Sequence, residues 1–122
     1  MSGSELKVQL TGLGLSPAWL ADRLKVTTRT VIRWFDIDEV PARVIAEIEL
    51  MSAITSKEID RMIHDATHGG VVYTKRTDQV AVGVAKRNTL PASWHRALTF
   101  RALEHVRSRG ADTTVAYITQ SQ

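Results

Sequence analysis

The chain has 122 residues, 43% of them hydrophobic and 24% charged, which is an ordinary composition for a folded globular domain. It contains no cysteine, which excludes a disulfide scaffold, thiol catalysis and cysteine-ligated zinc. The 16 Lys and Arg exceed the 13 Asp and Glu, and this balance permits a polyanionic partner without demanding one. No apolar run is long enough to span a membrane and no signal peptide is recognisable, so we expect a cytoplasmic protein.

Residues 1–68 have the apolar spacing of consecutive helices. Four local signals predict where the early helices begin and end: a cap at Ser4, a stop at Gly12 and Gly14, a new start at Ser16-Pro17 and a further cap at Thr27. Helical spacing resumes after Pro41 and continues to residue 68. Because Thr55-Ser-Lys-Glu58 fits a capping box, this stretch is either one helix or two.

Residues 69–122 have a different sequence pattern, with β-branched runs and one helical stretch. The pair Gly69-Gly70 marks the predicted domain boundary. β-branched runs predict strands at 71–75 and 113–118, and Pro91 predicts the start of a helix that ends near Gly110. The alternating residues 80–85 read as a strand that pairs with the first one in a hairpin, with a short helix as the competing interpretation. The expected class is therefore α+β.

The most informative stretch is PAWLADRLKVTTRTVIRWF, residues 17–35. Two short helices that cross steeply need a small residue near the crossing, a brief turn and apolar anchors on the second helix. Ala21, Val26, Val31 and Trp34 meet these needs, so the spacing is that of a helix-turn-helix. The alternative is an ordinary helical bundle with a solvated basic face.

If the anchors point inward, Thr28, Arg29, Ile32 and Arg33 share the outward face. A guanidinium on that face can bond guanine O6 and N7 bidentately. Lys25 takes a turn position that favours glycine because of its positive φ, at a cost of about 1 kcal/mol, and its ammonium would lie near a phosphate.

These residues resemble the Cro/CI-type helix-turn-helix repressors and, more narrowly, the YdiL-like group that includes the anti-CRISPR-associated autorepressors. The resemblance extends over nearly the whole chain and includes VTTRTVIRWF, a VP before a long helical stretch with ELMSAI, a strand with Tyr73, and a late helix begun by Trp94 and Leu98. It implies a homodimeric repressor of its own operon, such as an anti-CRISPR operon of a phage or mobile element. The dimer would form through the C-terminal half and bind an inverted repeat.

Carried over by position, the resemblance places Thr28, Arg29, Ile32 and Arg33 against bases in the major groove and Thr27 near a phosphate. Some members of the group bind RNA, so RNA stays open as a partner. The resemblance also favours a helix where residues 80–84 read as a strand.

The late helix supports dimerisation independently, because Trp94, Leu98, Ala102, Leu103 and Val106 cover about half of its circumference. One small sheet buries less than this, so the surplus suggests a partner subunit, and the alternative is burial inside the monomer. The residues assigned to the dimer interface are Tyr73, Trp94, Leu98, Phe100 and Ala102. The prediction is thus an all-helical helix-turn-helix bundle at 1–68, then a sheet-plus-helix dimerisation region at 69–122.

Other chemistry is thinly represented. Asp60, His64 and His68 fall four residues apart, but the HExxH pattern of a zinc protease is missing. We therefore expect no metal, no cofactor and no enzymatic activity. A hydrolytic metalloprotein that uses the two histidines and an antitoxin-like protein-binding module remain as alternatives.

Overall fold

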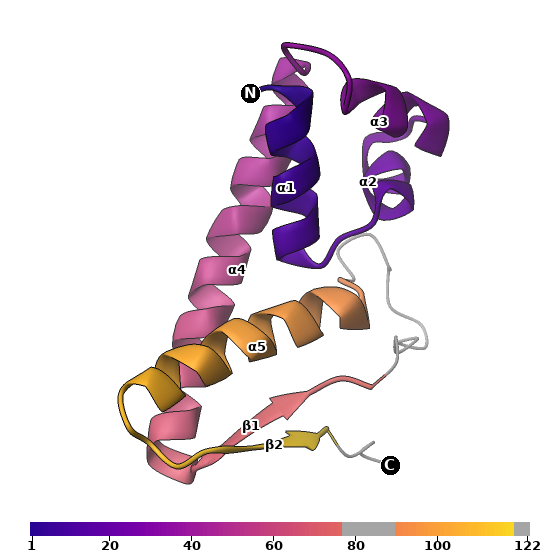
Figure 1. Ribbon diagram of the computed structural model, residues 1–122. Helices are drawn as coiled ribbons and strands as arrows, with labels where there is room; N and C mark the ends of the chain where they lie inside the picture. The colour runs from indigo at the N-terminus through magenta and orange to yellow at the C-terminus, as the bar shows by residue number, and fades with distance from the viewer. Residues whose placement is uncertain (77–89, 119–122) are drawn as a thin grey trace. The chain divides into compact units, whose positions relative to one another are not determined.

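The computed structural model describes residues 1–76 and 90–118, and these residues contain five helices and two strands (Figure 1). This mixture agrees with the predicted α+β class. The chain divides into two compact units, Met1–Ile54 and Thr55–Gln122. Within the described ranges, no helix is both long and apolar enough to cross a membrane.

The first unit begins with α1, Gly3–Leu13. Its cap is Ser2 and not Ser4 as predicted, because Ser2 has the extended backbone of a capping residue and its hydroxyl accepts a first-turn amide at 3.2 Å. Ser4 already lies within the helix. At the other end Gly14 ends the helix in a left-handed conformation with φ 70°, as predicted, whereas Gly12 remains helical.

Two short helices follow, α2 at Pro17–Leu24 and α3 at Thr28–Trp34. The predicted caps are confirmed, because the Ser16 hydroxyl accepts a first-turn amide at 3.1 Å and the Thr27 hydroxyl accepts one at 3.2 Å. The core of the unit is built from side chains of these three helices and of the chain that follows them. Its buried members include Leu6, Leu10, Leu13, Leu20, Val31, Val44 and Ile48.

A single helix, α4, runs from Ala42 to Gly69 and contributes residues to both units. Thr55 does not cap a second helix. Its side chain is buried, and its hydroxyl accepts a hydrogen bond from Nε1 of Trp94 at 2.9 Å. This bond lies within the second unit, because the units divide after Ile54. The predicted boundary at residues 68 and 69 coincides with the end of α4.

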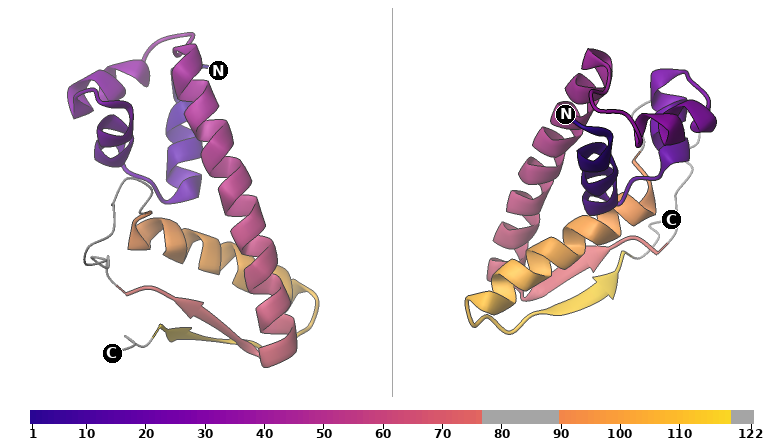
Figure 2. Two further views of the ribbon diagram at one scale, coloured as in Figure 1. Left: turned by 180° about the vertical axis from the view of Figure 1, so that it is seen from behind. Right: turned by 45° about the horizontal axis from the view of Figure 1, so that its top comes forward.

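The second unit contains β1 at Val71–Thr74, α5 at Ala92–Ser108 and β2 at Thr114–Tyr117. The strands pair in parallel, with Val72 opposite Val115. Parallel neighbours need a crossover connection, and α5 lies within it and packs on one face of β1 (Figure 2). Since a two-stranded sheet is marginal in water, this packing is what stabilises it.

The strands predicted at 71–75 and 113–118 and the helix predicted after Pro91 are thereby confirmed. The predicted partner of the first strand, residues 80–85, lies outside the described residues, and β1 pairs with the last strand. The buried side chains of the unit are mainly apolar. They include Met62, Ala66, Val72, Trp94, Leu98, Ala102 and Val106.

Candidate nucleic-acid interface

The turn between α2 and α3 is closed by backbone hydrogen bonds. Lys25 adopts the left-handed conformation expected for it, with φ 60° and ψ 43°. The amide of Val26 bonds the carbonyl of Ala21 at 3.0 Å, and the amide of Lys25 bonds that of Asp22 at 3.4 Å. This is the Schellman pattern that normally ends on glycine, so the turn keeps its geometry in spite of the lysine.

The buried side chains of α2 and α3 orient α3. Val31 and Trp34 on α3 are buried, as are Leu20 and Ala21 on α2, and the two helices pack directly against each other. Val26, which was expected to plug the core, is only half-buried. The anchors nevertheless fix which side of α3 meets solvent.

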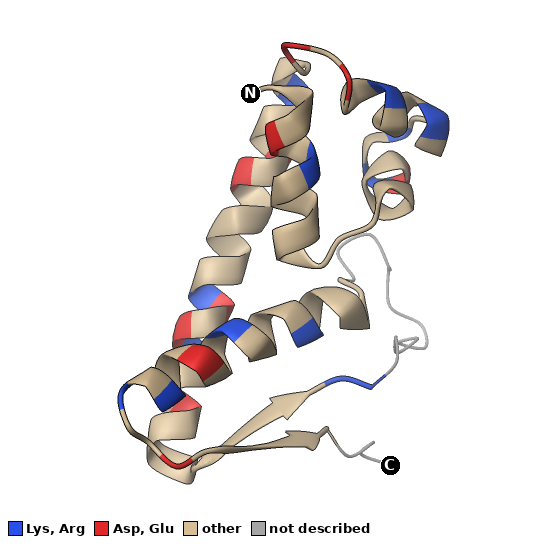
Figure 3. Ribbon diagram, in the orientation of Figure 1, with Lys and Arg blue, Asp and Glu red and all other residues tan. Residues whose placement is uncertain are grey.

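The opposite face of α3 is exposed and carries the predicted residues. Thr28, Arg29, Ile32 and Arg33 are all exposed, with 51% of Ile32 accessible, and Lys25 and Thr27 are exposed beside them. Figure 3 marks the basic positions of α3 in blue. The structure therefore brings all six predicted residues to one end of the first unit.

The cations of this face differ from a neighbouring arginine in how they are paired. Among the described residues, no Asp or Glu lies within ion-pair distance of Lys25, Arg29 or Arg33. Arg23 differs, because its Nε donates to a carboxylate oxygen of Glu47 at 2.6 Å and both side chains are largely covered. Three cations of the face are thus available to a polyanion, whereas Arg23 serves to hold α2 against α4.

Two further cations near α3 were missed in the sequence. The guanidinium carbon of Arg43, in the first turn of α4, lies 6.0 Å from the ring centre of Trp34. The ammonium of Lys7 lies 5.8 Å from the ring centre of Phe35. Both pairs join residues distant in sequence, so no local pattern could reveal them. The exposed acidic loop of residues 36–39 follows α3 directly.

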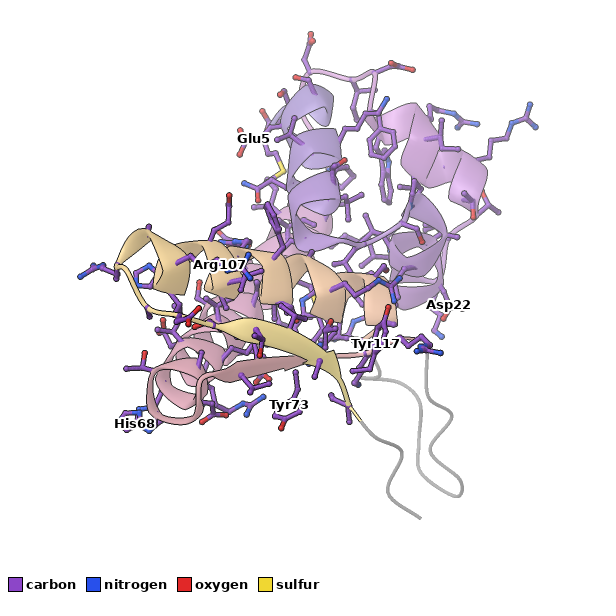
Figure 4. All side chains as sticks on the ribbon, turned by 60° about the horizontal axis from the view of Figure 1, so that its bottom comes forward. Glu5, Asp22, His68, Tyr73, Arg107 and Tyr117 are labelled. Carbon is purple, nitrogen blue, oxygen red and sulfur yellow. The ribbon has the colours of Figure 1, made fainter. Side chains whose placement is uncertain are left out.

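The residues assigned to a dimer interface separate into two groups. Trp94, Leu98 and Ala102 are buried inside the second unit, and that removes them from any surface a partner could reach. This corrects the interpretation of α5, whose apolar surplus is covered by its own chain. Tyr73 and Phe100 are 56% and 59% exposed, and Figure 4 shows Tyr73 on β1.

Exposed apolar side chains continue from Tyr73 along the sheet. All four residues of β2 are exposed, including Val115 and Tyr117, and Ile118 follows them. The ring of Tyr117 lies under the guanidinium of Arg76 at 4.4 Å. A set of exposed apolar residues on so small a sheet is the kind of surface that interaction partners cover.

The histidines of the second unit have separate environments. His64 and His68 stack with ring centres 4.2 Å apart, and no group of three metal-ligating side chains occurs among the described residues. His95 is buried, and its Nδ1 has no hydrogen-bond partner in the part of the chain that the structure describes. Burial lowers the pKa of His95, and the charges of Lys75 and Arg61 lower it further against the opposing effect of Glu58.

A small cavity of about 60 Å³ adjoins His95, and Arg61, Asp65 and Tyr73 also line it. Arg61 in this cavity is paired with Glu58 and with Asp65, so its charge is already compensated.

No family model, curated protein or solved structure matches the chain. The proposal about function therefore rests on the exposed face of α3 and on its cations, which have no carboxylate partner in the described part of the chain.

Proposed function

We propose that the protein is a sequence-specific DNA-binding transcriptional repressor that acts as a homodimer on an inverted repeat. The observation that supports this most directly is the exposed face of α3, where Arg29 and Arg33 have no carboxylate partner among the described residues. Two such guanidinium groups on a short, firmly packed helix suit a reader of the major groove.

Each side chain of this face has a defined role in the proposal. Arg29 and Arg33 stand four residues apart, about 6 Å along the helix axis, so each can reach a separate base pair. Ile32 lies between them with half of its surface exposed, and an apolar side chain there suits the methyl group of thymine. Thr28 completes the set as a hydroxyl that can bond either kind of base edge.

Flanking cations would hold the phosphate backbone. Lys25 projects from the turn before α3, and Arg43 lies beside Trp34 at its end, so the two bracket the helix. The hydroxyl of Thr27 accepts the capping hydrogen bond of α3. Thr27 is exposed at the start of this helix, which is the position that the proposal assigns to a phosphate. Phosphate contacts of this kind fix register and leave sequence reading to the helix face.

Repression follows from occupancy in this proposal, because a dimer bound across a promoter blocks polymerase. The resemblance to autorepressors, including those of anti-CRISPR operons, supports the protein's own operon as the target. The exposed apolar residues of the sheet support a dimer built on the second unit.

The direct test is binding to a duplex from the region upstream of the protein's own coding sequence, compared with a scrambled duplex and with an RNA copy of the same sequence. We expect the upstream duplex to bind about a thousandfold more tightly than the scrambled one at physiological salt. Equal affinity for both duplexes at every salt concentration would contradict the proposal. Preference for the RNA copy would move the target to RNA.

An antitoxin-like protein-binding module is the second candidate. The observation that favours it is the exposed apolar surface of the sheet, with Tyr73 on one face and Val115 and Tyr117 on the other. Co-expression with the protein encoded next to it, followed by gel filtration, separates the two functions. A stable mixed complex that does not bind the upstream duplex favours the module.

A further inference from the structure

The positive charge of the chain is concentrated in the unit that does not contain α3. Residues 1–54 hold six Lys and Arg against seven Asp and Glu, a net charge of −1. Residues 55–122 hold ten against six, a net charge of +4. A domain that reads bases normally relies on positive charge for affinity, and here the first unit has no surplus of it.

Helix α5 and its cap carry much of this charge, with four arginines and one Glu. Two of the arginines are bonded to the chain next to the strands. Arg96 donates to the carbonyls of Lys75 and Arg76, just after β1, at 3.1 and 2.7 Å, and Arg107 donates to that of Thr113, just before β2, at 3.0 Å. These bonds hold the sheet against the helix.

The other two arginines, Arg101 and Arg109, are exposed, and no ion pair joins them to a carboxylate among the described residues. They alternate with exposed His105 at intervals of four residues, so the three side chains form a row along one side of the helix, about 6 Å apart. We call Arg101, His105 and Arg109 the α5 row.

Two members of the α5 row, His105 and Arg109, border an open hollow of about 380 Å³, which Ile63, Thr67 and Val106 also line. No Asp or Glu is among the residues that line it, and Glu58 and Asp65 on α4 are engaged by Arg61. An accessible hollow with a basic edge and an apolar floor can receive a partner that presents regularly spaced negative charges.

We propose that the α5 row binds the phosphate backbone of duplex DNA without reading its bases. This inference rests on the proposed function, and it assigns to the second unit the sequence-independent part of the affinity. The two arginines stand about two helical turns apart, so each can neutralise a separate phosphate of a backbone that carries one charge per nucleotide, and each phosphate neutralised releases a condensed counterion. An acidic protein segment has no condensed counterion layer to release, so its binding would depend much less steeply on salt.

The experiment measures affinity for the upstream duplex and for a scrambled duplex between about 50 and 200 mM salt, a range over which phosphate contacts dominate. Replacing both arginines, Arg101→Gln with Arg109→Gln, should reduce the slope of log K against log salt by about 0.9 for each phosphate that is no longer neutralised. At about 0.15 M salt each such phosphate corresponds to binding that is about fivefold weaker, through counterion release alone. The ratio between the two duplexes should stay unchanged, because no base contact is removed.

A matched control is Lys57→Gln, which removes one exposed positive charge from α4 in the same unit and should leave the slope as it is. An equal slope for the double variant, Arg101→Gln with Arg109→Gln, and for Lys57→Gln overturns the inference, provided that circular dichroism shows both proteins folded. If the wild type lacks operator preference but its slope still depends on the α5 row, the proposed function fails and the inference stands. If the wild type binds neither duplex at about 50 mM salt, both fail.

Discussion

At the scale of single residues, Arg29 and Arg33 carry the assignment of α3 as a reader of DNA. Both are exposed, unpaired with carboxylates in the described part of the chain, and outside the core formed by Val31 and Trp34. If each forms a bidentate pair with guanine, its replacement by alanine should weaken operator binding by about 1 to 3 kcal/mol per half-site. The substitution should relax preference at one base pair, because each arginine reads one.

The measurement is the affinity of Arg29→Ala and Arg33→Ala for operator variants changed at single base pairs. Lys7→Ala is the charge control in the same unit, because Lys7 lies over Phe35, outside α3, and its loss should leave the preference among the operator variants unchanged. Both arginine variants should unfold at the same urea concentration as the wild type. Full operator preference in both variants would remove α3 from the reading role.

The buried imidazole of His95 makes the stability of the second unit depend on pH. Its pKa is lowered in the folded state, first by burial and then by the charges of Lys75 and Arg61. The unfolded chain therefore binds a proton more readily, so stability is complete above about pH 6.5 and falls as the pH drops below that value. Urea unfolding at pH 7.5 and 5.5 measures the loss, which His95→Leu should reduce. An unchanged difference in that variant would assign the loss to other groups.

At the scale of elements, the turn between α2 and α3 separates stability from binding. Lys25 has φ 60°, a conformation that costs a residue with a side chain about 1 kcal/mol and costs glycine almost nothing. Lys25→Gly should therefore stabilise the protein by about 1 kcal/mol and still weaken binding to operator and scrambled duplex alike. Lys25→Ala is the control, because it removes the ammonium without relieving the backbone. Urea denaturation and binding across salt concentrations check the two effects, and a glycine variant that is less stable than wild type would contradict the first.

Local signals predicted the ends of most elements, and long-range contacts decided the rest. Ser16, Thr27 and Gly14 act within one helical turn, so their roles were readable from the sequence. The continuity of α4 was not readable, because the hydroxyl of Thr55 is engaged by Trp94, which is 39 residues away. The parallel pairing of β1 with β2 depends in the same way on distant segments.

For the candidate site, too, local patterns were readable from the sequence and long-range contacts were not. The six residues around α3 were predictable because a helix-turn-helix spacing states which side of the helix is anchored. The burial of Trp94, Leu98 and Ala102 was not predictable, since a half-apolar helix looks the same whether its own chain or a partner covers it. Arg43 and Lys7 near α3 were missed because cation–ring contacts leave no local pattern.

At the scale of the whole molecule, the surface that we propose for a dimer differs from the one that the sequence predicted. With three assigned residues buried, the large exposed apolar side chains among the described residues of the second unit are those on the sheet and on the outer side of α5. They are Tyr73, Phe100, Val115, Tyr117 and Ile118. A homodimer built there would cover side chains that are costly to leave in water, and its two α3 helices should reach half-sites about 34 Å apart.

Sedimentation at micromolar concentration tests this expectation, and a dimer should have about twice the monomer mass of 13.6 kDa. Tyr73→Asp tests one face of the sheet and Val115→Asp tests the other. The variant on the covered face should shift the protein to the monomer, because the carboxylate would lose its hydration there. Val8→Asp is the control, since Val8 on α1 is 70% exposed but belongs to the first unit. A wild type that sediments as a monomer at every concentration would refute the dimer. A dimer that survives both sheet variants would place its interface elsewhere. If a variant is monomeric, its operator binding shows how far affinity depends on two half-sites being held together.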